Sequence, residues 1–507
     1  MIDIKKLLKE FASETTCHGP AQIAKQKRTV FHRIIWLTLM LGLTSGMIWQ
    51  LKSKIQEYTE YPTSTSIQEK YKTELDFPEV TICNYNRFFG IESALEVQTL
   101  DTLIEVSSPY KPHGNYSEWW TQEVDLYYKE LRKQGNKTFL LSDELKSKGW
   151  VLNDTSIKKC SFRSKACSIK NFKRILTPMG ICYTFAVHDA IQTIPGSGNG
   201  LVLVLDINQE RYATHPHYGF PGAGVKVHVH GAKEPPLIQN FGVSVPSGHC
   251  GHIVMQRTQR KLMNPPWGIC SKETTKLRHF SEYSTAACYI ECRTDYVIKR
   301  CGCKPYWAPV KRYEVEECNA LQILDCAGEV ESQFMSKITM SKCGCVTPCE
   351  FVTYETKVTY STFPSVQIGQ HLISPNNLKV VKLSTGRNFT KTIEEVSVYR
   401  ENYLMLDIYF DSLSDREIIQ SKSVSEISFI CDIGGLLGLW VGISFVTMFE
   451  FFQLFVAIIC GAGATTGDSK NIQIETGLIT QKDTFSTRML SSKEVEKFDC
   501  LTFESKS

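Results

Sequence analysis

Two apolar stretches bracket a long cysteine-rich segment, and the second stretch carries acidic residues within it. This stretch spans residues 427–459 and includes Asp432 and Glu450. An ionised carboxylate near the centre of a bilayer costs about 2.5–3.5 kcal/mol on insertion scales. A helix that serves only as an anchor gains nothing that offsets this cost. The acids therefore indicate a helix that lines a water-filled path for cations.

The first apolar stretch, residues 34–51, is 18 residues long, which is about 27 Å of helix and enough to cross a hydrocarbon core. Basic residues precede it and no small-residue cleavage site follows, so we expect a retained helix with a cytoplasmic N-terminus. Two spans return the C-terminus to the same side, which predicts a plasma-membrane protein. The expected segments are a cytoplasmic 1–30, a first span 31–52, an extracellular 53–426, a second span 427–459 and a disordered cytoplasmic tail 460–507.

The segment between the spans has two marks of an extracellular environment. Fifteen of the 19 cysteines lie between residues 83 and 349, a density typical of an oxidising compartment. We expect disulfides rather than zinc sites because no histidine has finger-like spacing, and the odd number leaves at least one thiol unpaired, with Cys250 as a candidate. All four glycosylation sequons also lie there, at Asn115, Asn136, Asn153 and Asn388.

Alternating patterns predict strands between the spans, so the expected fold class is an α+β membrane protein with two transmembrane helices. The strand patterns are residues 77–83, 200–206, 225–230, 351–358 and 402–410. A net charge of +4 points to no nucleic-acid partner. The sequence shows no phosphate-binding glycine loop outside the membrane, no nucleophile elbow and no metal-ligand cluster, so we expect neither an enzyme nor a cofactor.

The second span offers two geometries. Gly434, Gly438 and Gly442 form a ladder that by itself is typical of helix packing. Asp432 and Glu450 are 18 residues apart, which is five turns, so an unbroken helix places both on one stripe. A break near Gly442 would instead expose backbone carbonyls, which membranes tolerate only where they line a cavity. Either geometry predicts a pore, and a pore requires several copies around an axis.

The second stretch closely resembles the second transmembrane helix of degenerin/epithelial sodium channels. The matching run is Cys431-Asp432-Ile433-Gly434-Gly435-Leu436-Leu437-Gly438-Leu439-Trp440-Val441-Gly442-Ile443-Ser444. The same family is matched by His18-Gly19, by Phe77-Pro78-Glu79-Val80-Thr81-Ile82-Cys83-Asn84, by Pro265-Pro266-Trp267-Gly268-Ile269-Cys270 and by the order of the cysteines. The resemblance covers about residues 15–460 and is strongest to acid-sensing and cnidarian peptide-gated members. It implies a homo- or heterotrimer with a hand-shaped, disulfide-rich extracellular domain that passes sodium and is blocked by amiloride.

The resemblance also implies roles for individual residues. These are a selectivity filter at Gly442, Ile443 and Ser444, pore acids at Asp432 and Glu450, a gate at Cys431, a gating loop at His18 and Gly19, aromatic coupling between the extracellular domain and the pore at Tyr61 and Trp267, and a desensitisation linker at Ser412, Leu413 and Ser414. The implied disulfides are Cys83–Cys182, Cys160–Cys167, Cys270–Cys349, Cys288–Cys345, Cys292–Cys343, Cys301–Cys326 and Cys303–Cys318, which leave Cys250 over.

This chain departs from the family pattern at positions that affect which stimulus would open the channel. Acid-sensing members have histidine after the coupling tyrosine, where this chain has Pro62 and Thr63, and they cluster carboxylates where it has Thr214-His215-Pro216-His217-Tyr218. Paired carboxylates sense protons because like charges raise each other's pKa, and these residues cannot reproduce that effect. We therefore favour an extracellular peptide over protons as agonist. Proton, mechanical and constitutive gating are the alternatives within the family.

Two other classes of protein share the topology. A two-span receptor with a disulfide-rich extracellular domain explains the cysteines but leaves Asp432 and Glu450 without a role. A two-span ectoenzyme ranks third because no catalytic constellation is present. The expected partners are two further subunits, membrane lipid and an extracellular agonist.

Overall fold

The computed structural model covers the whole chain and describes most of it. The described residues are 4–24, 29–106, 140–187, 190–213, 222–272, 276–308, 314–338, 342–366 and 396–463, together with the single residues 126, 129, 133, 368 and 369. The chain divides into two compact units, which we describe separately. The small unit is Met1–Gln50 with Gly434–Ser507, and the large unit is Leu51–Ile433.

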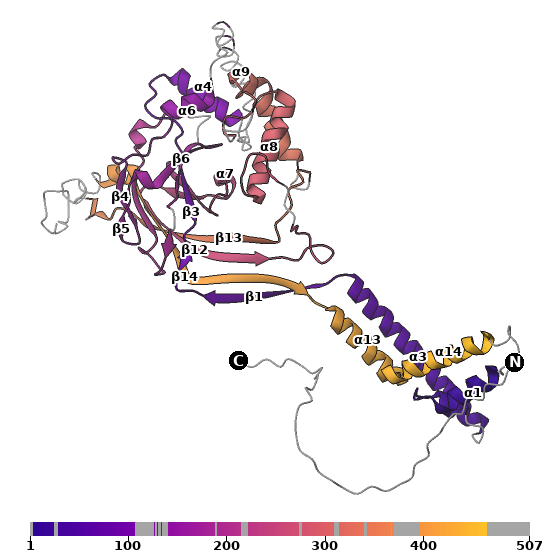
Figure 1. The fold of residues 1–507 in the computed structure, drawn as a ribbon. Helices are drawn as coiled ribbons and strands as arrows, with labels where there is room; N and C mark the ends of the chain where they lie inside the picture. Colours follow the sequence, from indigo (N-terminus) through magenta and orange to yellow (C-terminus); the bar gives the residue numbers. More distant parts are fainter. Residues whose placement is uncertain are drawn as a thin grey trace. The chain divides into compact units, whose positions relative to one another are not determined.

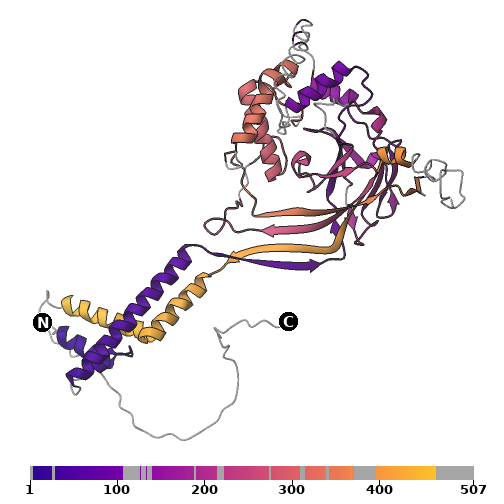
Figure 2. The ribbon, with the colours of Figure 1, turned by 180° about the vertical axis from the view of Figure 1, so that it is seen from behind.

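A seven-stranded sheet forms the frame of the large unit. Its order is β13-β12-β14-β9-β4-β5, and β1 pairs with the far half of β14 (Figures 1 and 2). All its strand pairs are antiparallel except β12 with β14. The strands are β1 (Thr63–Tyr71), β4 (Ile157–Phe162), β5 (Lys165–Ala166), β9 (Leu201–Asp206), β12 (His249–Lys261), β13 (Glu350–Thr362) and β14 (Tyr403–Lys422).

A second sheet of five strands has the order β11-β10-β3-β7-β6, and a two-stranded ribbon joins β2 to β8. These strands are β2 (Leu75–Asp76), β3 (Glu79–Asn84), β6 (Phe172–Thr177), β7 (Gly180–Phe185), β8 (Ile191–Gln192), β10 (Gly224–His230) and β11 (Val243–Pro246). The helices of this unit are α4 (Ala94–Val106), α6 (Leu141–Lys148), η1 (Ile169–Asn171), η2 (Gln209–Arg211), α7 (Ile238–Phe241), α8 (Thr285–Cys301), α9 (Ala320–Gln322), η3 (Ile323–Ala327) and α10 (Gly328–Lys337).

The strand β14 shows how the sequence produces this frame. Leu404, Leu406, Ile408 and Phe410 alternate with more polar residues, so they share one face of the strand. All four side chains are fully buried in the core beneath the sheet. The structure extends β14 well past the predicted 402–410, because β1 pairs with its polar second half.

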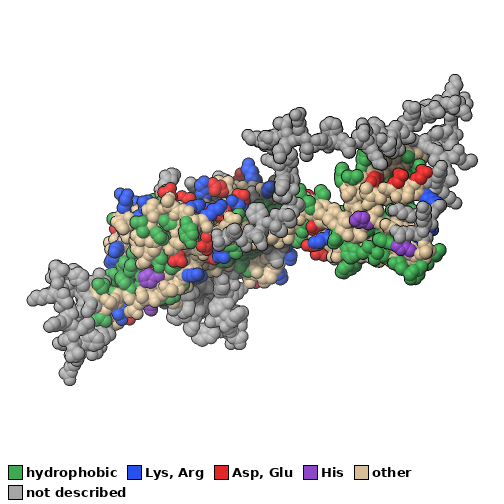
Figure 3. Space-filling model, turned by 90° about the horizontal axis from the view of Figure 1, so that it is seen from below, with side chains coloured by type: hydrophobic (Ala, Val, Ile, Leu, Met, Phe, Trp, Pro, Cys, Tyr) green, Lys and Arg blue, Asp and Glu red, His purple; other side chains and the backbone are tan. Residues whose placement is uncertain are grey.

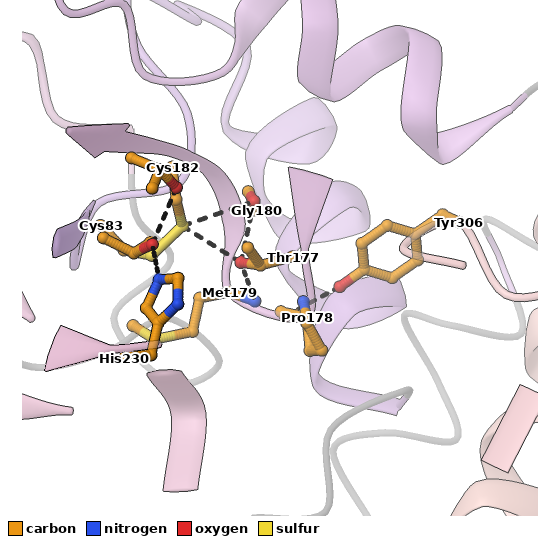
Figure 4. Close-up of a disulfide and its surroundings, with 10 residues drawn as sticks. Cys83, Thr177, Pro178, Met179, Gly180, Cys182, His230 and Tyr306 are labelled. Atoms are coloured by element: carbon orange, nitrogen blue, oxygen red, sulfur yellow. Dashed lines mark hydrogen bonds between the residues drawn. A yellow bond between two sulfur atoms is a disulfide. The ribbon is translucent and has the colours of Figure 1, made fainter. Parts of the chain in front are cut away.

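Seven disulfides hold the large unit together, and they are the same seven pairs that the family resemblance implied. They are Cys83–Cys182, Cys160–Cys167, Cys270–Cys349, Cys288–Cys345, Cys292–Cys343, Cys301–Cys326 and Cys303–Cys318. Three of them fasten α8, which begins at the capping residue Ser284, whose Oγ accepts a hydrogen bond from the Ala287 N–H. Beside Cys83–Cys182, the Tyr306 hydroxyl donates to the Pro178 carbonyl at 2.9 Å and ties the segment after α8 to the β6–β7 turn (Figure 4).

Two helical segments are long and apolar enough to cross a membrane. One is α3 (Val30–Thr59), and the other is the bent pair α13 (Glu426–Val441) and α14 (Phe445–Gly463). Large hydrophobic side chains are exposed along all three helices. Figure 3 shows such side chains gathered in patches, with basic and acidic side chains intermixed elsewhere on the face in view.

The helix α3 is longer than the predicted span of residues 31–52. Its polar extension contains no helix breaker before Pro62, and the residue before this proline, Tyr61, has a positive φ of 51°. The helix therefore ends at Thr59 rather than where the hydrophobic residues end. The small unit also contains α1 (Ile4–Glu14) and α2 (Pro20–Ala24), and residues 464–507 of the predicted tail lie outside the described part.

Candidate functional site

The second span is broken at Gly442-Ile443-Ser444, where α13 and α14 meet at 79°. Gly442 has a φ of +68°, a conformation that glycine adopts at little cost. Ser444 starts α14, because its Oγ accepts a hydrogen bond from the Thr447 N–H at 3.2 Å. The break rules out the predicted single stripe for Asp432 and Glu450, since the five-turn spacing holds only for a continuous helix. It leaves the other predicted geometry, in which backbone groups at the break face a cavity.

The predicted gating loop, which contains His18 and Gly19, lies against this break. The His18 N–H donates to the Val441 carbonyl at 3.2 Å, and the Gly19 carbonyl accepts from Gln22 in the first turn of α2. A Cβ atom added to Gly442 would lie 2.2 Å from His18 Nδ1. The loop therefore packs against the backbone of the break so closely that only glycine fits.

The acid Glu450 on α14 is hydrogen-bonded by the same loop. Thr15 Oγ1 donates to Glu450 Oε2 at 2.8 Å, and the Thr16 N–H donates to the same oxygen at 3.0 Å. Thr16 Oγ1 also lies 2.7 Å from Thr447 Oγ1. Both bonds to the carboxylate end on Oε2, so Oε1 remains available to water or a cation. No local pattern indicates the threonine contacts, because the partners are more than 430 positions apart in the chain.

Within the small unit, α3 and α13 approach each other closely. A Cβ atom on Gly46 would lie 3.0 Å from the ring of Trp440, so a larger residue there would push the helices apart. The Trp440 Nε1–H donates to Gln50 Oε1 at 2.9 Å, which satisfies the indole donor inside an apolar contact.

The outer acid Asp432 lies near the far end of α3, within the large unit. Lys54 Nζ is 3.6 Å from Asp432 Oδ2, and Tyr58 stacks on Phe429 with ring centroids 4.3 Å apart. Both charged groups of the pair are substantially exposed, so we expect the ion pair to orient the carboxylate more than to stabilise the fold. Cys431, the predicted gate, is exposed and lies outside the seven disulfides.

The aromatic pair predicted to couple the extracellular domain to the pore is in contact. Tyr61 and Trp267 meet edge to face with centroids 5.3 Å apart, and Lys422 Nζ lies 3.9 Å from the centre of the Trp267 ring. The Ser423 N–H donates to the Pro62 carbonyl at 3.0 Å. These contacts join the ends of β1 and β14 at the points where the chain turns toward α3 and α13.

The predicted desensitisation linker is a bulge in β14. Met255 pairs with Phe410 and Arg257 with Asp415, so residues 411–414 stand opposite the single residue Gln256. Ser412 Oγ and Ser414 Oγ are 2.7 Å apart, and the Leu413 carbonyl accepts from the Lys72 N–H. The bulge therefore leaves the pairing with β12 but keeps contacts with the end of β1, where Ser414 pairs with Tyr71.

An ion-paired group next to this bulge was missed by the sequence reasoning. Asp415 is fully buried, forms an ion pair with Arg257 and has Lys72 Nζ at 2.9 Å. Removing one partner of a buried pair is costly because it leaves the other charge unpaired. Only the register of the sheet reveals this group, since Arg257 and Asp415 lie on two different strands and Lys72 directly follows a third, β1.

The remaining predicted sites divide by whether the structure describes them. Asn153 is exposed, whereas Asn115, Asn136, Asn388 and the loop from Thr214 to Tyr218 lie outside the described residues. Within the described ranges, no cluster of three His, Cys, Asp or Glu side chains could hold a metal ion. Cys250 is buried and outside the disulfides.

Acidification from about pH 6.5 toward pH 4 is expected to destabilise the large unit through His228 and His230. Burial, with smaller effects of His230 and Lys226, lowers the pKa of His228 to about 3, and burial lowers the pKa of His230 to about 4. Unfolded histidine binds protons near pH 6.5, so below that pH the unfolded chain gains protons that the folded chain does not. The free energy of unfolding should fall by up to about 1.4 kcal/mol per pH unit for each group.

Thermal unfolding of the purified protein at pH 7 and pH 5 checks this prediction. His228→Phe should flatten the pH dependence, because the ring stacks on His230 and Phe241 and an aromatic replacement keeps that packing. His249→Phe, at a less buried position on β12, is the control. An unchanged pH dependence in His228→Phe would contradict the assignment.

The chain is similar to known ion channels. The family described as "Amiloride-sensitive sodium channel" matches residues 11–454. The bile acid-sensitive ion channel of Mus musculus is 31% identical over 469 residues, covering 89% of this chain and 88% of that protein. The human bile acid-sensitive ion channel is 29% identical over 468 residues, covering 89% and 85%. Acid-sensing ion channel 1 of Gallus gallus is 28% identical over 493 residues, covering 94% and 89%.

The family match includes the first apolar stretch, most of the second and the disulfide-rich α/β domain between them. It assigns the broken second span and the acids beside it to a family of ion channels rather than of enzymes. The chain belongs to the amiloride-sensitive sodium channel family.

Proposed function

We propose that this chain forms a trimeric, sodium-selective channel of the plasma membrane that an extracellular ligand opens. The observation that carries the proposal is the break at Gly442-Ile443-Ser444, with Glu450 held beside it by Thr15 and Thr16. Backbone groups at a break and carboxylates nearby are the elements from which cation filters are built. Two spans of one chain cannot enclose a pore, so three subunits, identical or related, supply the pathway.

Replacing Ser444 with leucine is expected to reduce the preference for sodium over potassium several-fold. The small hydroxyl starts α14 and contacts Thr447, so a larger apolar residue would remove the cap and change the width of the break. Reversal potentials in bi-ionic sodium and potassium solutions measure the permeability ratio. Phe449→Leu, on an exposed face of α14, is the matched control. Equal reversal potentials in all three channels would count against this filter assignment.

For the stimulus, we propose an extracellular peptide. The names of the relatives refer to bile acids and to acid, so a bile salt and acid are the stimuli with which a peptide is compared. The positions where acid-sensing members carry histidine hold Pro62 and Thr63, which have no titratable group, and the Pro62 carbonyl is engaged by Ser423. This supports a stimulus other than protons.

Voltage clamp of oocytes that express the chain tests the proposal directly. Acid steps, a bile salt and amidated peptides are applied in turn, each with and without amiloride. A peptide-evoked, amiloride-blocked sodium current is the expected result. Current evoked by acid alone, by membrane stretch or without any stimulus would replace the peptide. Surface expression with specific ligand uptake and no current would favour a two-span receptor.

A further inference from the structure

A large cavity in the large unit has Arg257 in its wall, the residue that pairs with Asp415 directly after the bulge of β14. Its volume is about 1370 Å³, and its wall comes from β10, the segment leading to α7, the start of α8, β12 and β13. Phe77, Leu237 and Phe241 are among its apolar lining residues. Small-molecule pockets usually measure about 300–1,000 Å³, so this cavity exceeds what a single small ligand fills.

The edge strand β13 presents unpaired main-chain groups to this cavity. The Phe363 N–H donates to the Gly248 carbonyl, and the Cys349 carbonyl accepts from the Leu262 N–H. Residues at odd positions of β13 therefore bond to β12, and those at even positions direct their N–H and C=O groups away from it. The even-numbered residues Glu350, Val352, Tyr354 and Thr356 all line the cavity. Among the described residues, no main-chain partner pairs with this edge.

The spacing of the main-chain groups along this edge determines what kind of ligand can bind to it. Donor and acceptor groups recur every second residue, which is about 6.6 Å along a strand. An extended peptide reproduces this repeat in its own backbone, and exposed edges are known templates for an added strand. A rigid small molecule cannot match more than one or two of these positions.

The charges around the cavity favour a basic peptide. Four acids, Asp76, Glu234, Glu282 and Glu350, line it against three bases, Arg257, Lys261 and Lys272. Arg257 is neutralised by Asp415, and Glu282 pairs with Lys233, which lies outside the lining. Three acids and two bases remain, so a peptide with at least one positive charge balances the cavity better than an anion would.

The cavity is joined to the bulge by one row of residues across the sheet. Tyr354 on β13 faces Arg257 on β12, which faces Asp415 on β14, which in turn faces Lys70 on β1. Tyr354 and Arg257 are directly opposite each other in the pairing of β13 with β12, and Arg257 forms an ion pair with Asp415. A strand added beside Tyr354 therefore acts on the residue that closes the bulge, on the strand that leads to α13.

We propose that an extended basic peptide binds in this cavity by adding a strand to the free edge of β13, and that the row Tyr354–Arg257–Asp415 transmits its binding to the bulge. This assignment rests on the proposed function as a ligand-gated channel.

The test uses Val352→Pro in the full-length channel. Proline removes the outward N–H at this position, and the ladder to β12 remains because Val352 does not donate to it. The probe is a library of amidated tetrapeptides with lysine or arginine fixed at one position, applied to oocytes under voltage clamp. Val352→Thr keeps the N–H, and Thr362→Pro removes an outward N–H on the same strand outside the cavity.

We expect Val352→Pro to raise the half-maximal concentration of active peptides about tenfold or more, and the two controls to stay within about twofold of wild type. N-methylation of an active peptide should abolish activity at alternate residues only. The proposal is overturned if Val352→Pro behaves like wild type, if Thr362→Pro shifts equally, or if no library peptide opens the wild-type channel. A bile salt response that shifts in the same way would assign the cavity to an amphiphile instead.

Thiol modification of Cys431 is expected to open the channel without a peptide. The resulting current shows whether a negative result is due to the proposed binding site or to the proposed channel function. If that current is present and peptides are inactive, only the binding site is wrong. If it is absent in wild-type protein at the cell surface, the proposed function itself falls.

Discussion

Treatment of the extracellular face with a membrane-impermeant, positively charged thiol reagent is expected to produce a large standing sodium current through Cys431. The residue is exposed on α13 directly before Asp432, where family resemblance predicts that a small side chain is needed for closure. If closure needs a small side chain at this position, as the resemblance implies, a bulky charged adduct prevents closure. We expect the resting, amiloride-blocked current to rise at least about tenfold.

The reagent should react selectively with Cys431 because the other cysteines are not accessible to it. Fourteen cysteines are in disulfides, and Cys17 and Cys250 are buried. Cys460 and Cys500 follow the second apolar stretch, on the side expected to be cytoplasmic, which an impermeant extracellular reagent does not reach. Burial also raises the pKa of Cys250 to about 11, with Asp407 contributing, which keeps this thiol protonated and unreactive. Cys431→Ala is the control and should be insensitive. Verified modification of Cys431 without a change in resting current would refute its role as a gate.

Gly442→Ala is expected to reduce the sodium current more than tenfold at unchanged surface expression. An alanine at a φ of +68° costs about 1–2 kcal/mol, and its Cβ would lie 2.2 Å from His18 Nδ1. The loop that holds Glu450 must then move from the break, and the filter is distorted. Currents are best compared after thiol opening of Cys431, so that altered agonist binding does not enter.

The matched control is Gly434→Ala, because a Cβ atom at Gly434 meets nothing within 4 Å. It should retain most of the current. His18→Ala in the Gly442→Ala background should restore part of the loss by removing the clash, although the backbone strain remains. Full current in Gly442→Ala alone would mean that the close packing of the loop is not needed for conduction.

The sequence alone predicts the helices and strands that are determined by residues close to one another in the chain. Alternation of apolar residues indicates β9, β10 and the first half of β14, and two apolar stretches between polar flanks indicate the spans. The second half of β14 is mostly polar and shows no alternation of its own, and it is a strand because β12 and β1 pair with it on either side. The end of α3 likewise depends on Pro62 rather than on hydrophobicity.

The candidate site also combines a motif that the local sequence identifies with contacts between residues that are far apart in the chain. Gly442, Ile443 and Ser444 could be singled out as a motif, but either a continuous or a broken helix was compatible with them. The break depends on the loop from Thr15 to Gly19, which packs against it from the other end of the chain. The ion pair of Arg257 with Asp415 requires the register of β12 and β14, and a parallel pairing across about 160 residues has no local signature.

The bulge in β14 contains residues that do not pair with β12. Four residues stand opposite one on β12, so β14 holds three residues more than its neighbour over the same stretch. If they entered the ladder, the downstream half of β14 would advance by about 10 Å relative to β12. Such a shift would break and re-form the pairs of residues 415–419 with β12, and it would displace the start of α13 by about the length of two helical turns.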